Sequence, residues 1–426
     1  MAHDVRNRLS TLRRSFHRHP EPGWCEFQTA SRIVDELHRI GVDDVAIGSE
    51  TLSDPDRMAL PPAETVTAWR NRAADAGVDA ALLERLDGGH TGVVATVHRG
   101  PGPTVGVRVD MDGVSMTEST AVGHRPADEG FRSAHEGYMH ACGHDAHVTI
   151  ALGVLEAVAA SDFSGSFRVF FQPAEEIAGG GKPMAESGLV DDVDYLFAFH
   201  LGLGHPTGAV VANATRPLAM AHINATFEGA SAHAGKNPSG GTNAMQAMTT
   251  AVQNAYGIPR HADGLTRINF GRVEGGSASN VIAEEVVLDG EVRGETTALM
   301  EYMRTNLERE LYAAAELHQC DVVIERTSES IRVDGDPTLA GAVSDVAHRL
   351  SSIRDVTETA PLGASEDATF LMKRVHERGS RAAYLLIGTD HPTAHHTPTF
   401  DIDERSLDLG VELLTTCVTA VAEDRP

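Results

Sequence analysis

Lysine is almost missing from this chain of 426 residues, which has only Lys182, Lys236 and Lys373. Asp and Glu number 61 against 35 Lys plus Arg, which gives a formal net charge of −26 at pH 7. Nucleic acid requires a basic face for its phosphates, so this composition excludes it as a partner. The acidic residues are spread along the chain. We interpret so much dispersed acid with so little lysine as halophilic adaptation, because an ordinary acidic enzyme would not explain the missing lysine.

The chain is also poor in cysteine and has no long apolar run. Its four cysteines, Cys25, Cys142, Cys320 and Cys417, are too few and too dispersed for a disulfide scaffold. No stretch of about 18 apolar residues occurs, so we expect no transmembrane helix and no membrane partner. The first residues are polar and lead directly into a helical pattern, unlike a signal peptide. We therefore expect a cytoplasmic protein.

Hydrophobic periodicity predicts an α/β protein. β-rich runs at 104–110, 166–172 and 195–200 are joined by a helical pattern at 145–160, as in an α/β sheet. Side chains capable of chemistry follow these runs, at the strand ends where open α/β sheets place their sites. Outside this region we predict helices on either side of a turn at 19–22, a strand at 382–388 and a closing helix at 403–423.

The pattern changes after residue 216. Up to residue 329 it predicts strand, helix, strand, strand, helix, strand, which is the order of a ferredoxin-like unit. We therefore expect one domain from residues 1–216 and 330–426, with a helical insertion at about 50–89, and a second domain from 217–329. The elements expected in the second domain are strands at 221–229, 266–275, 285–293 and 320–326, and helices at 242–256 and 296–318.

The segment His140-Ala-Cys-Gly-His-Asp-Ala-His147 concentrates metal-ligand side chains. Cys142 and His144 lie at the start of a predicted helix. A turn around Gly143 can aim both at one metal ion, while the helix N-terminus favours the thiolate. An isolated Cys-x-His pair would be better explained as a buried cysteine beside surface histidines. Three histidines and an aspartate within eight residues favour a metal site instead.

A pair of glutamates follows the strand at 166–172. Glu175 and Glu176 come after a proline, and neighbouring side chains in a turn point in different directions. One can therefore bind a metal ion while the other acts as general base on a water molecule. Paired glutamates are otherwise common on solvated helix faces, and it is the preceding strand that favours a site here.

Further donors come from histidines and aspartates at other strand ends. His200 ends an apolar run, where a single histidine is more often a core residue than a ligand. Either His395 or His396 could complete a second metal site, and His396 is favoured because it lies beside the turn. Asp110 and Asp112 could accept hydrogen bonds from ligating histidines. Two metal ions that each take roughly four to six ligands need about this many metal-binding side chains.

In combination, these motifs resemble the amidohydrolase branch of the aminoacylase and carboxypeptidase superfamily of dinuclear metallopeptidases. The resemblance extends from about Arg14 to Glu404. Within the branch the chain is most similar to the p-aminobenzoyl-glutamate hydrolase subgroup, in the insertion at 50–89 and the runs at 190–195 and 366–371. The motifs are Arg108-Val-Asp-Met-Asp112, Met139–His147, Phe171-Gln-Pro-Ala-Glu-Glu176, Ser231-Ala-His-Ala-Gly235, Gly241-Thr-Asn-Ala244, Asn280-Val-Ile-Ala283 and Ser365-Glu-Asp367.

The resemblance implies a metallopeptidase-like catalytic domain with an inserted dimerisation lid at 217–329. It implies two divalent ions, Mn²⁺ or Zn²⁺, with Glu175 as the base. His233 would reach the partner's active site to stabilise the oxyanion, near Asn280, and Arg293 would hold a substrate carboxylate. For Arg293 a surface ion pair with Glu291 or Glu295 is the alternative, and the sequence leaves both open. The implied metal ligands are Cys142, His144, Glu176, His200 and His396.

The implied activity is metal-dependent hydrolysis of the amide bond of N-acyl or N-aroyl amino acids, with p-aminobenzoyl-glutamate as one candidate. The active form would be a homodimer or a heteromer with a paralogous subunit. One alternative is a non-catalytic subunit that binds a metal or a ligand or has a regulatory role, which would not need the base Glu175. Another is a dipeptide carboxypeptidase, which Cys142-Gly-His144 disfavours because peptidase branches resemble one another in using a bridging aspartate.

The acidic composition predicts a dependence of stability on salt. At ~0.1 M KCl the Debye length is about 10 Å, so repulsion among carboxylates reaches across neighbouring surface residues, whereas molar salt screens it. We expect the melting temperature to fall by several degrees or more as KCl is lowered from molar concentrations to ~0.1 M. Thermal unfolding followed across a KCl series checks this, and a melting temperature independent of salt would exclude the halophilic interpretation.

Overall fold

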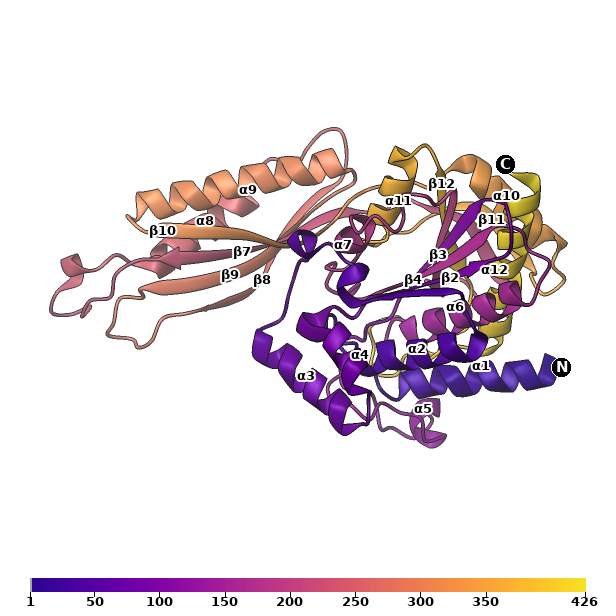
Figure 1. The fold of residues 1–426 in the computed structure, drawn as a ribbon. Helices are drawn as coiled ribbons and strands as arrows, with labels where there is room; N and C mark the ends of the chain where they lie inside the picture. Colours follow the sequence, from indigo (N-terminus) through magenta and orange to yellow (C-terminus); the bar gives the residue numbers. More distant parts are fainter. Residues whose placement is uncertain (1) are drawn as a thin grey trace. The chain divides into compact units, whose positions relative to one another are not determined.

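The computed structural model describes residues 2–426, with side chains from residue 7 onward. It contains two compact units, each with its own sheet (Figure 1). The large unit runs to Thr215 and resumes over Val333–Leu362 and Asp367–Pro426. The small unit comprises Arg216–Arg332 and the short segment Gly363–Glu366. Within the described chain, no helix has the length and apolar character needed to cross a membrane.

The large unit is built on an eight-stranded sheet with the order β1-β2-β4-β3-β5-β12-β6-β11. Its centre is parallel, because β4, β3, β5 and β12 run in one direction. The carboxyl ends of these four strands therefore meet at one edge of the sheet, where α/β proteins place their sites. The strands are β1 (Asp44–Ile47), β2 (Val93–His98), β3 (Thr104–Asp110), β4 (Ser166–Gln172), β5 (Tyr195–Leu201), β6 (Ala209–Thr215), β11 (Asp355–Pro361) and β12 (Arg381–Ile387).

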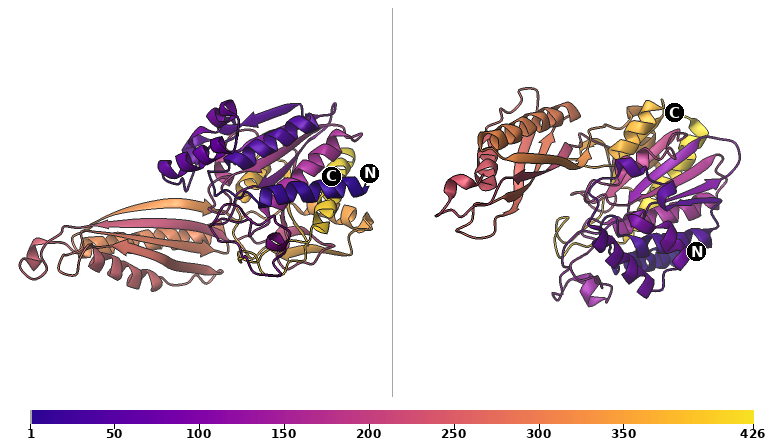
Figure 2. Two further views of the ribbon diagram at one scale, coloured as in Figure 1. Left: turned by 90° about the horizontal axis from the view of Figure 1, so that it is seen from below. Right: turned by 60° about the vertical axis from the view of Figure 1, so that its left-hand side comes forward.

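Helices cover both faces of this sheet (Figures 1 and 2). Successive strand residues point to opposite faces, so Val105, Val107 and Val109 pack into a core with α1, α2, α6, α10 and α12. On the other face, Phe170 and Leu196 pack with α7 and α11. The helices are α1 (Ala2–His17), α2 (Phe27–Ile40), α3 (Ala63–Asp75), α4 (Ala80–Arg85), α5 (Arg125–Asp128), α6 (His144–Ala159), α7 (Gly181–Ala185), α10 (Pro337–Arg349), α11 (Thr369–Glu377) and α12 (Arg405–Asp424).

Helix α6 is the central helix of this unit, and nearly all of its residues are buried. It packs against β3, β4 and β5 on one side and against α1, α2 and α12 on the other. Gly153 permits the close approach of α12, because a Cβ atom at this position would lie 2.5 Å from a methyl group of Val411. This packing fixes the N-terminus of α6 at the carboxyl edge of the sheet.

The small unit has a four-stranded antiparallel sheet with the order β10-β7-β9-β8. Helices α8 and α9 pack on one face, and buried residues of β7, α8, β8, β9 and α9 form one core, against which the half-buried Val322 and Ile324 of β10 pack. This order confirms the predicted ferredoxin-like unit. The elements are β7 (Ala219–Glu228), α8 (Ala244–Tyr256), β8 (Thr266–Gly275), β9 (Glu285–Gly294), α9 (Thr297–Leu317) and β10 (Asp321–Ser330).

Every strand and helix predicted above is present, with boundaries within a few residues of those expected. The sequence reading did not identify β1, β2, β6 and β11, nor α10 and α11 as separate helices. β11 lies at the edge of the sheet and has only exposed and half-buried residues, without regular alternation, which leaves a weak hydrophobic signal. Short 3₁₀ turns occur at 48–50, 54–56, 87–89 and 238–240.

Candidate metal centre

The five candidate metal ligands come together at the carboxyl edge of the large sheet. Their ligand atoms form two groups that share Cys142, and within each group the atoms lie within 4.8 Å of one another. These two groups are the residues that would hold two metal ions, and each group offers donor atoms that such ions prefer. One group is Cys142, His144 and His200, and the other is Cys142, Glu176 and His396.

Cys142 precedes α6 and faces His200 at the end of β5. Gly143 has a left-handed conformation with φ of 89°, which turns the chain sharply into the helix. The sulfur of Cys142 lies 3.3 Å from Nε2 of His200. Nδ1 of His200 lies 2.7 Å from the carbonyl oxygen of Leu201 and donates to it, so Nε2 carries the lone pair that faces Cys142. His200 is buried, but it is oriented toward the candidate site.

His144 is surrounded by carboxylates. Its Nδ1 donates to the carbonyl oxygen of Asp112 at 3.0 Å. Its Nε2 has no hydrogen-bond partner among the described residues, although Asp110, Glu176 and Glu175 each place an oxygen within 3.6 to 3.8 Å. Burial opposes a charge on this ring, but Asp110, Asp112 and Glu176 outweigh it and raise the pKa of His144 to about 10.

This environment fits a bound cation. Nε2 of His144 and Oε1 of Glu176 are both buried without a hydrogen-bond partner in the described part of the chain, and they lie 3.7 Å apart. Unpartnered buried polar atoms are costly, and metal ions bound by the two groups would provide a partner for each of them. The donor set of one thiolate, imidazoles and carboxylates suits a divalent transition metal ion.

A strained turn after β4 positions the two glutamates. Ala174 has a φ of 55°, a left-handed conformation that costs a non-glycine residue about 1–3 kcal/mol. Its N–H donates to Oε1 of the buried Glu26 at 2.8 Å. The N–H of Glu176 donates to Oδ2 of Asp112 at 3.0 Å. These bonds hold the turn, so that both Glu175 and Glu176 reach toward His144 from adjacent positions.

The structure distinguishes His395 from His396. Nε2 of His396 lies 3.3 Å from Oε2 of Glu176, and its backbone has a φ of 57°. The hydrogen bond to Glu176 raises the pKa of His396. Nε2 of His395 instead lies 3.1 Å from the carbonyl oxygen of Leu201, and its ring packs against Phe400. His396 therefore joins the ligand group, and His395 supports the loop.

Asp110 and Asp112 have different partners. Oδ1 of Asp112 lies 3.3 Å from Nδ1 of His144, but that N–H donates to the backbone carbonyl oxygen of Asp112, and Oδ1 has no hydrogen-bond partner among the described residues. Asp110 instead accepts a hydrogen bond of 2.6 Å from Nδ1 of His147. Its other oxygen accepts from the buried Arg108 at 3.0 Å.

The sequence reading missed the roles of Arg108 and His147, and of Gln172 and Asp367, which bond to Arg108. All four lie inside the motifs quoted above. The signal that could have found Arg108 and Gln172 is a charged or polar residue within an apolar strand, and for His147 it is a histidine within the almost fully buried helix α6, where a polar group requires a partner.

The small unit brings two of its three candidate residues together. His233 and Asn280 lie on neighbouring exposed loops, where the N–H of Ala234 donates to the carbonyl oxygen of Asn280 at 2.9 Å. Nδ1 of His233 accepts from the backbone N–H groups of Gly235 and Lys236, at 3.1 and 3.2 Å. A neutral ring that accepts at Nδ1 carries its hydrogen on Nε2. The exposed Nε2–H is therefore available as a donor.

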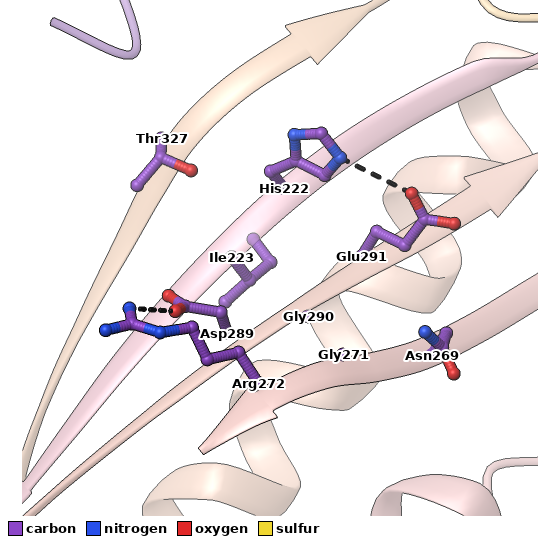
Figure 3. Close-up of a pocket in the computed structure, with 9 residues that line it drawn as sticks. All are labelled: His222, Ile223, Asn269, Gly271, Arg272, Asp289, Gly290, Glu291 and Thr327. Atoms are coloured by element: carbon purple, nitrogen blue, oxygen red, sulfur yellow. Dashed lines mark hydrogen bonds and ion pairs between the residues drawn. The ribbon is translucent and has the colours of Figure 1, made fainter. Parts of the chain in front are cut away.

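Arg293 lies apart from these two residues and forms a two-bond pair with Glu291, at 2.8 and 2.9 Å. This is the ion pair considered above as the alternative to substrate binding. His222 and Arg293 lower the pKa of Glu291 to about 2, with His222 the larger cause. Figure 3 shows His222 and Glu291 at a pocket on the sheet of the small unit, where Arg272 pairs with Asp289. The pocket has a volume of about 400 Å³. His233, Asn280 and Arg293 do not line this pocket.

Comparisons with known proteins agree with the motifs. The model of "Peptidase family M20/M25/M40" matches residues 106–420. The chain is 36% identical over 412 residues to one subunit of p-aminobenzoyl-glutamate hydrolase of Escherichia coli (strain K12), covering 96% of this chain and 94% of that protein. It is also 36% identical to indole-3-acetyl-aspartic acid hydrolase of Enterobacter agglomerans, covering 95% and 94%. The crystal structure of the aminobenzoyl-glutamate utilization protein from Klebsiella pneumoniae aligns with a TM-score of 0.83 at 30% identity, covering 98% and 96%.

The buried Glu26 predicts a dependence of stability on pH. Burial and the nearby Asp112 raise the pKa of Glu26 to about 8. A carboxyl group whose pKa is higher in the folded state stabilises the fold at acidic pH, and this contribution is lost as pH rises from about 4.5 through 8. In the wild type Oε2 of Glu26 accepts from the hydroxyl of Thr91. Gln at this position keeps the acceptor for Ala174, places an NH2 group that can donate to the hydroxyl oxygen of Thr91, and does not titrate.

We therefore expect Glu26→Gln to gain stability over the metal-free wild type between pH 5 and pH 9, by on the order of a few kcal/mol. Urea unfolding of both metal-free proteins across this range measures the difference. A difference that stays constant with pH would mean that Glu26 is ionised in the fold throughout.

Proposed function

The chain belongs to peptidase family M20/M25/M40 and is a hydrolase of amide bonds, and on this premise we propose that it releases an acidic amino acid from an N-acyl or N-aroyl conjugate. The observation that carries the proposal is the pair of ligand groups that share Cys142, with Glu175 beside them. The names of two relatives describe conjugates of glutamate and of aspartate. An N-acyl or N-aroyl glutamate or aspartate, p-aminobenzoyl-glutamate included, is therefore the substrate class we favour.

The proposed ligands of two divalent ions, Mn²⁺ or Zn²⁺, are Cys142, His144, Glu176, His200 and His396. When bound, such ions polarise an amide carbonyl and lower the pKa of water, which is the chemistry that the centre would supply. Glu175 is proposed as the proton carrier, because its carboxylate lies beside His144 and is partly accessible. It would take the proton from the attacking water and deliver it to the nitrogen of the leaving amino acid. One carboxylate then serves both halves of the reaction.

The small unit is proposed to complete the site across a subunit interface. The exposed Nε2–H of the partner subunit's His233 would donate to the oxyanion that develops on the amide carbonyl, with Asn280 on the neighbouring loop. Arg293 remains a proposed ligand for the substrate carboxylate, and in that role it would have to exchange its bonds with Glu291. In so acidic a chain, the paired donors of a guanidinium suit such a carboxylate.

Exposed apolar side chains of the small unit support this assembly. Most of the exposed large hydrophobic side chains in the described part of the chain lie in this unit, although it is the smaller one. Exposed apolar side chains that gather on one unit suggest a protein partner. A second copy or a paralogous subunit fits, and one relative is itself named as a subunit. These side chains are Met245, Tyr256, Val273, Tyr312, Leu317 and Val323.

Two alternatives differ from this proposal in what they require of the site. A non-catalytic metal- or ligand-binding subunit would not need a carboxylate at Glu175, which reaches toward His144 beside the ligand groups. A dipeptide carboxypeptidase would cleave a substrate with a free amino group, so a substrate panel separates the two activities. We also propose a cytoplasmic location and adaptation to high salt, on the basis of the composition.

The experiment that tests the proposed function separates proton transfer from metal binding. Glu175→Gln should keep two metal ions but lose about 10²- to 10⁴-fold in kcat on p-aminobenzoyl-glutamate, because it removes the base and no ligand. Cys142→Ala should lose metal as well, because it removes the donor common to both groups. Metal analysis beside kinetics, with Mn²⁺ and molar KCl present, measures both effects. Glu136→Gln, a change at an exposed carboxylate of the same unit, is the control.

Activity of Glu175→Gln close to that of wild type would show that another group is the base. The panel for these assays contains p-aminobenzoyl-glutamate, N-acetyl amino acids with acidic and neutral side chains, and dipeptides. Turnover confined to dipeptides would replace the proposed function with the carboxypeptidase. No turnover of any member, with both metal ions bound, would favour the non-catalytic alternative.

A mixing experiment tests the shared site. His233→Ala and Glu175→Gln proteins should each be nearly inactive, whereas a mixed dimer contains one site with both residues intact. Mixing equal amounts should therefore restore about a quarter of wild-type activity once subunits have exchanged at random, because half of the dimers are then mixed and each has one of two sites. No recovery, with exchange of labelled subunits demonstrated in parallel, would mean that each chain works alone.

A further inference from the structure

One buried histidine beside the candidate metal centre is neither a proposed ligand nor the base. His147 lies in α6, one turn after His144, and its side chain is fully buried. Nδ1 of His147 is 2.6 Å from Oδ1 of Asp110, and its Nε2 is 3.0 Å from the backbone nitrogen of Leu201. The ring therefore joins α6 to the ends of β3 and β5.

The two hydrogen bonds determine the tautomer of His147. A backbone N–H can only donate, so Nε2 of His147 accepts the hydrogen from Leu201. The ring hydrogen is then on Nδ1, where it is donated to Asp110. Both nitrogens are used, and no lone pair remains for a metal ion. His147 is thus closed to metal, even though its ligand atom lies within 4.8 Å of those of Asp110 and His144.

A buried set of hydrogen bonds fixes Asp110, the acceptor for His147. Nη1 of Arg108 donates to Oδ2 of Asp110 at 3.0 Å. Nε and Nη2 of Arg108 donate to Gln172 at 2.8 Å and to Asp367 at 3.0 Å. The amide of Gln172 in turn donates to Asp367 at 2.7 Å. All of these side chains are buried, and such an arrangement has few ways to relax.

Leu201 connects His147 to the proposed metal ligand His200. It follows His200, so its N–H belongs to the peptide group that joins the two residues. Its carbonyl oxygen accepts from Nδ1 of His200 at 2.7 Å and from Nε2 of His395 at 3.1 Å. The backbone that carries His200 is therefore held on one side by His147, while its carbonyl sets the orientation of the His200 ring.

We infer that His147 is a positioning residue for the metal centre, which orients His200 through the N–H of Leu201 and so sets the affinity for the ion that His200 binds. The inference rests on the proposed function, because it requires two ions with the ligands named above. His147 acts through the backbone of Leu201 and also lies edge to face against the ring of His200, with the two centroids 4.7 Å apart, and it is not itself a ligand. Its effect should therefore fall on one ion, whereas the ion held by Glu176 and His396 keeps its ligands.

Three substitutions at His147 separate its two bonds. Leu removes both of them. The side-chain amide of Gln reaches about as far as Nε2 of histidine, and its oxygen keeps an acceptor for the N–H of Leu201. The side-chain amide of Asn reaches only about as far as Nδ1, and its NH2 group keeps a donor for Asp110 but no acceptor for Leu201. His376→Leu is the matched control, because Nε2 of His376 accepts from the N–H of Ala382 at 3.3 Å, the same kind of bond elsewhere in the large unit.

The experiment is a titration of each metal-free protein with Co²⁺, followed by calorimetry and by absorbance, without substrate. We expect His147→Leu and His147→Asn to weaken one of two binding steps by about 10- to 100-fold and to leave the other within a few-fold of wild type. His147→Gln should stay close to wild type in both steps. The near-ultraviolet band from thiolate to Co²⁺ should persist in all variants, since Cys142 is unchanged.

Different results overturn the inference or the premise. If His147→Leu lowers the melting temperature as His376→Leu does but leaves both binding steps unchanged, His147 is only structural. Equal weakening of both steps, or failure of Gln to restore affinity, also overturns the inference. Wild-type protein that binds fewer than two Co²⁺ ions would instead refute the dinuclear centre on which the proposed function depends.

Discussion

Buried negative charge at the carboxyl edge of the large sheet is the constraint on which the rest of the site depends. Asp110 and Asp112 are almost completely inaccessible, and Glu176 lies close to both. A carboxylate that is buried away from water needs positive charge or hydrogen-bond donors around it. The structure supplies such partners to both aspartates. Arg108 and His147 bond to Asp110, and the N–H of Glu176 bonds to Asp112. The charge that remains around His144 fits a bound cation.

Backbone strain occurs at the same place. Ala174 precedes the two glutamates and His396 is a candidate ligand, and both have left-handed conformations that non-glycine residues rarely adopt. Hydrogen bonds hold each of them, from Ala174 to Glu26 and from His396 to the carbonyl oxygen of Ala141. Such conformations persist where the surrounding structure determines them, and they aim Glu175, Glu176 and His396 at one point. The strained backbone of Ala174 and His396 is therefore part of what positions the side chains of the site.

The small unit differs from the large one in its chemistry. Its buried residues form a compact core of their own, and its candidate residues His233 and Asn280 are exposed on loops. A histidine that accepts two backbone hydrogen bonds at Nδ1 is oriented before any substrate arrives. Together with the apolar side chains exposed on this unit, this favours a role in completing a site with a partner.

The sequence by itself determined the class of the fold and most of the candidate site. Periodicity located the parallel strands and the ferredoxin-like unit because both bury apolar residues with regular spacing. Cys142, His144, Glu175 and Glu176 were identifiable because motifs of metal-binding side chains lie close together along the chain. Edge strand β11 escaped detection because its exposed residues carry a weak hydrophobic signal.

Only the tertiary structure decided which residues meet. His200 is a single histidine after an apolar strand, and no local pattern distinguishes it from a core residue until β5 brings it 3.3 Å from Cys142. His395 and His396 are adjacent in sequence, and only the turn at His396 directs one of them to Glu176 and the other to Leu201. The bonds from Arg108 to Asp367 and from His147 to Leu201 join segments far apart in the chain. A sequence records which groups are available, whereas their hydrogen-bond partners depend on long-range packing.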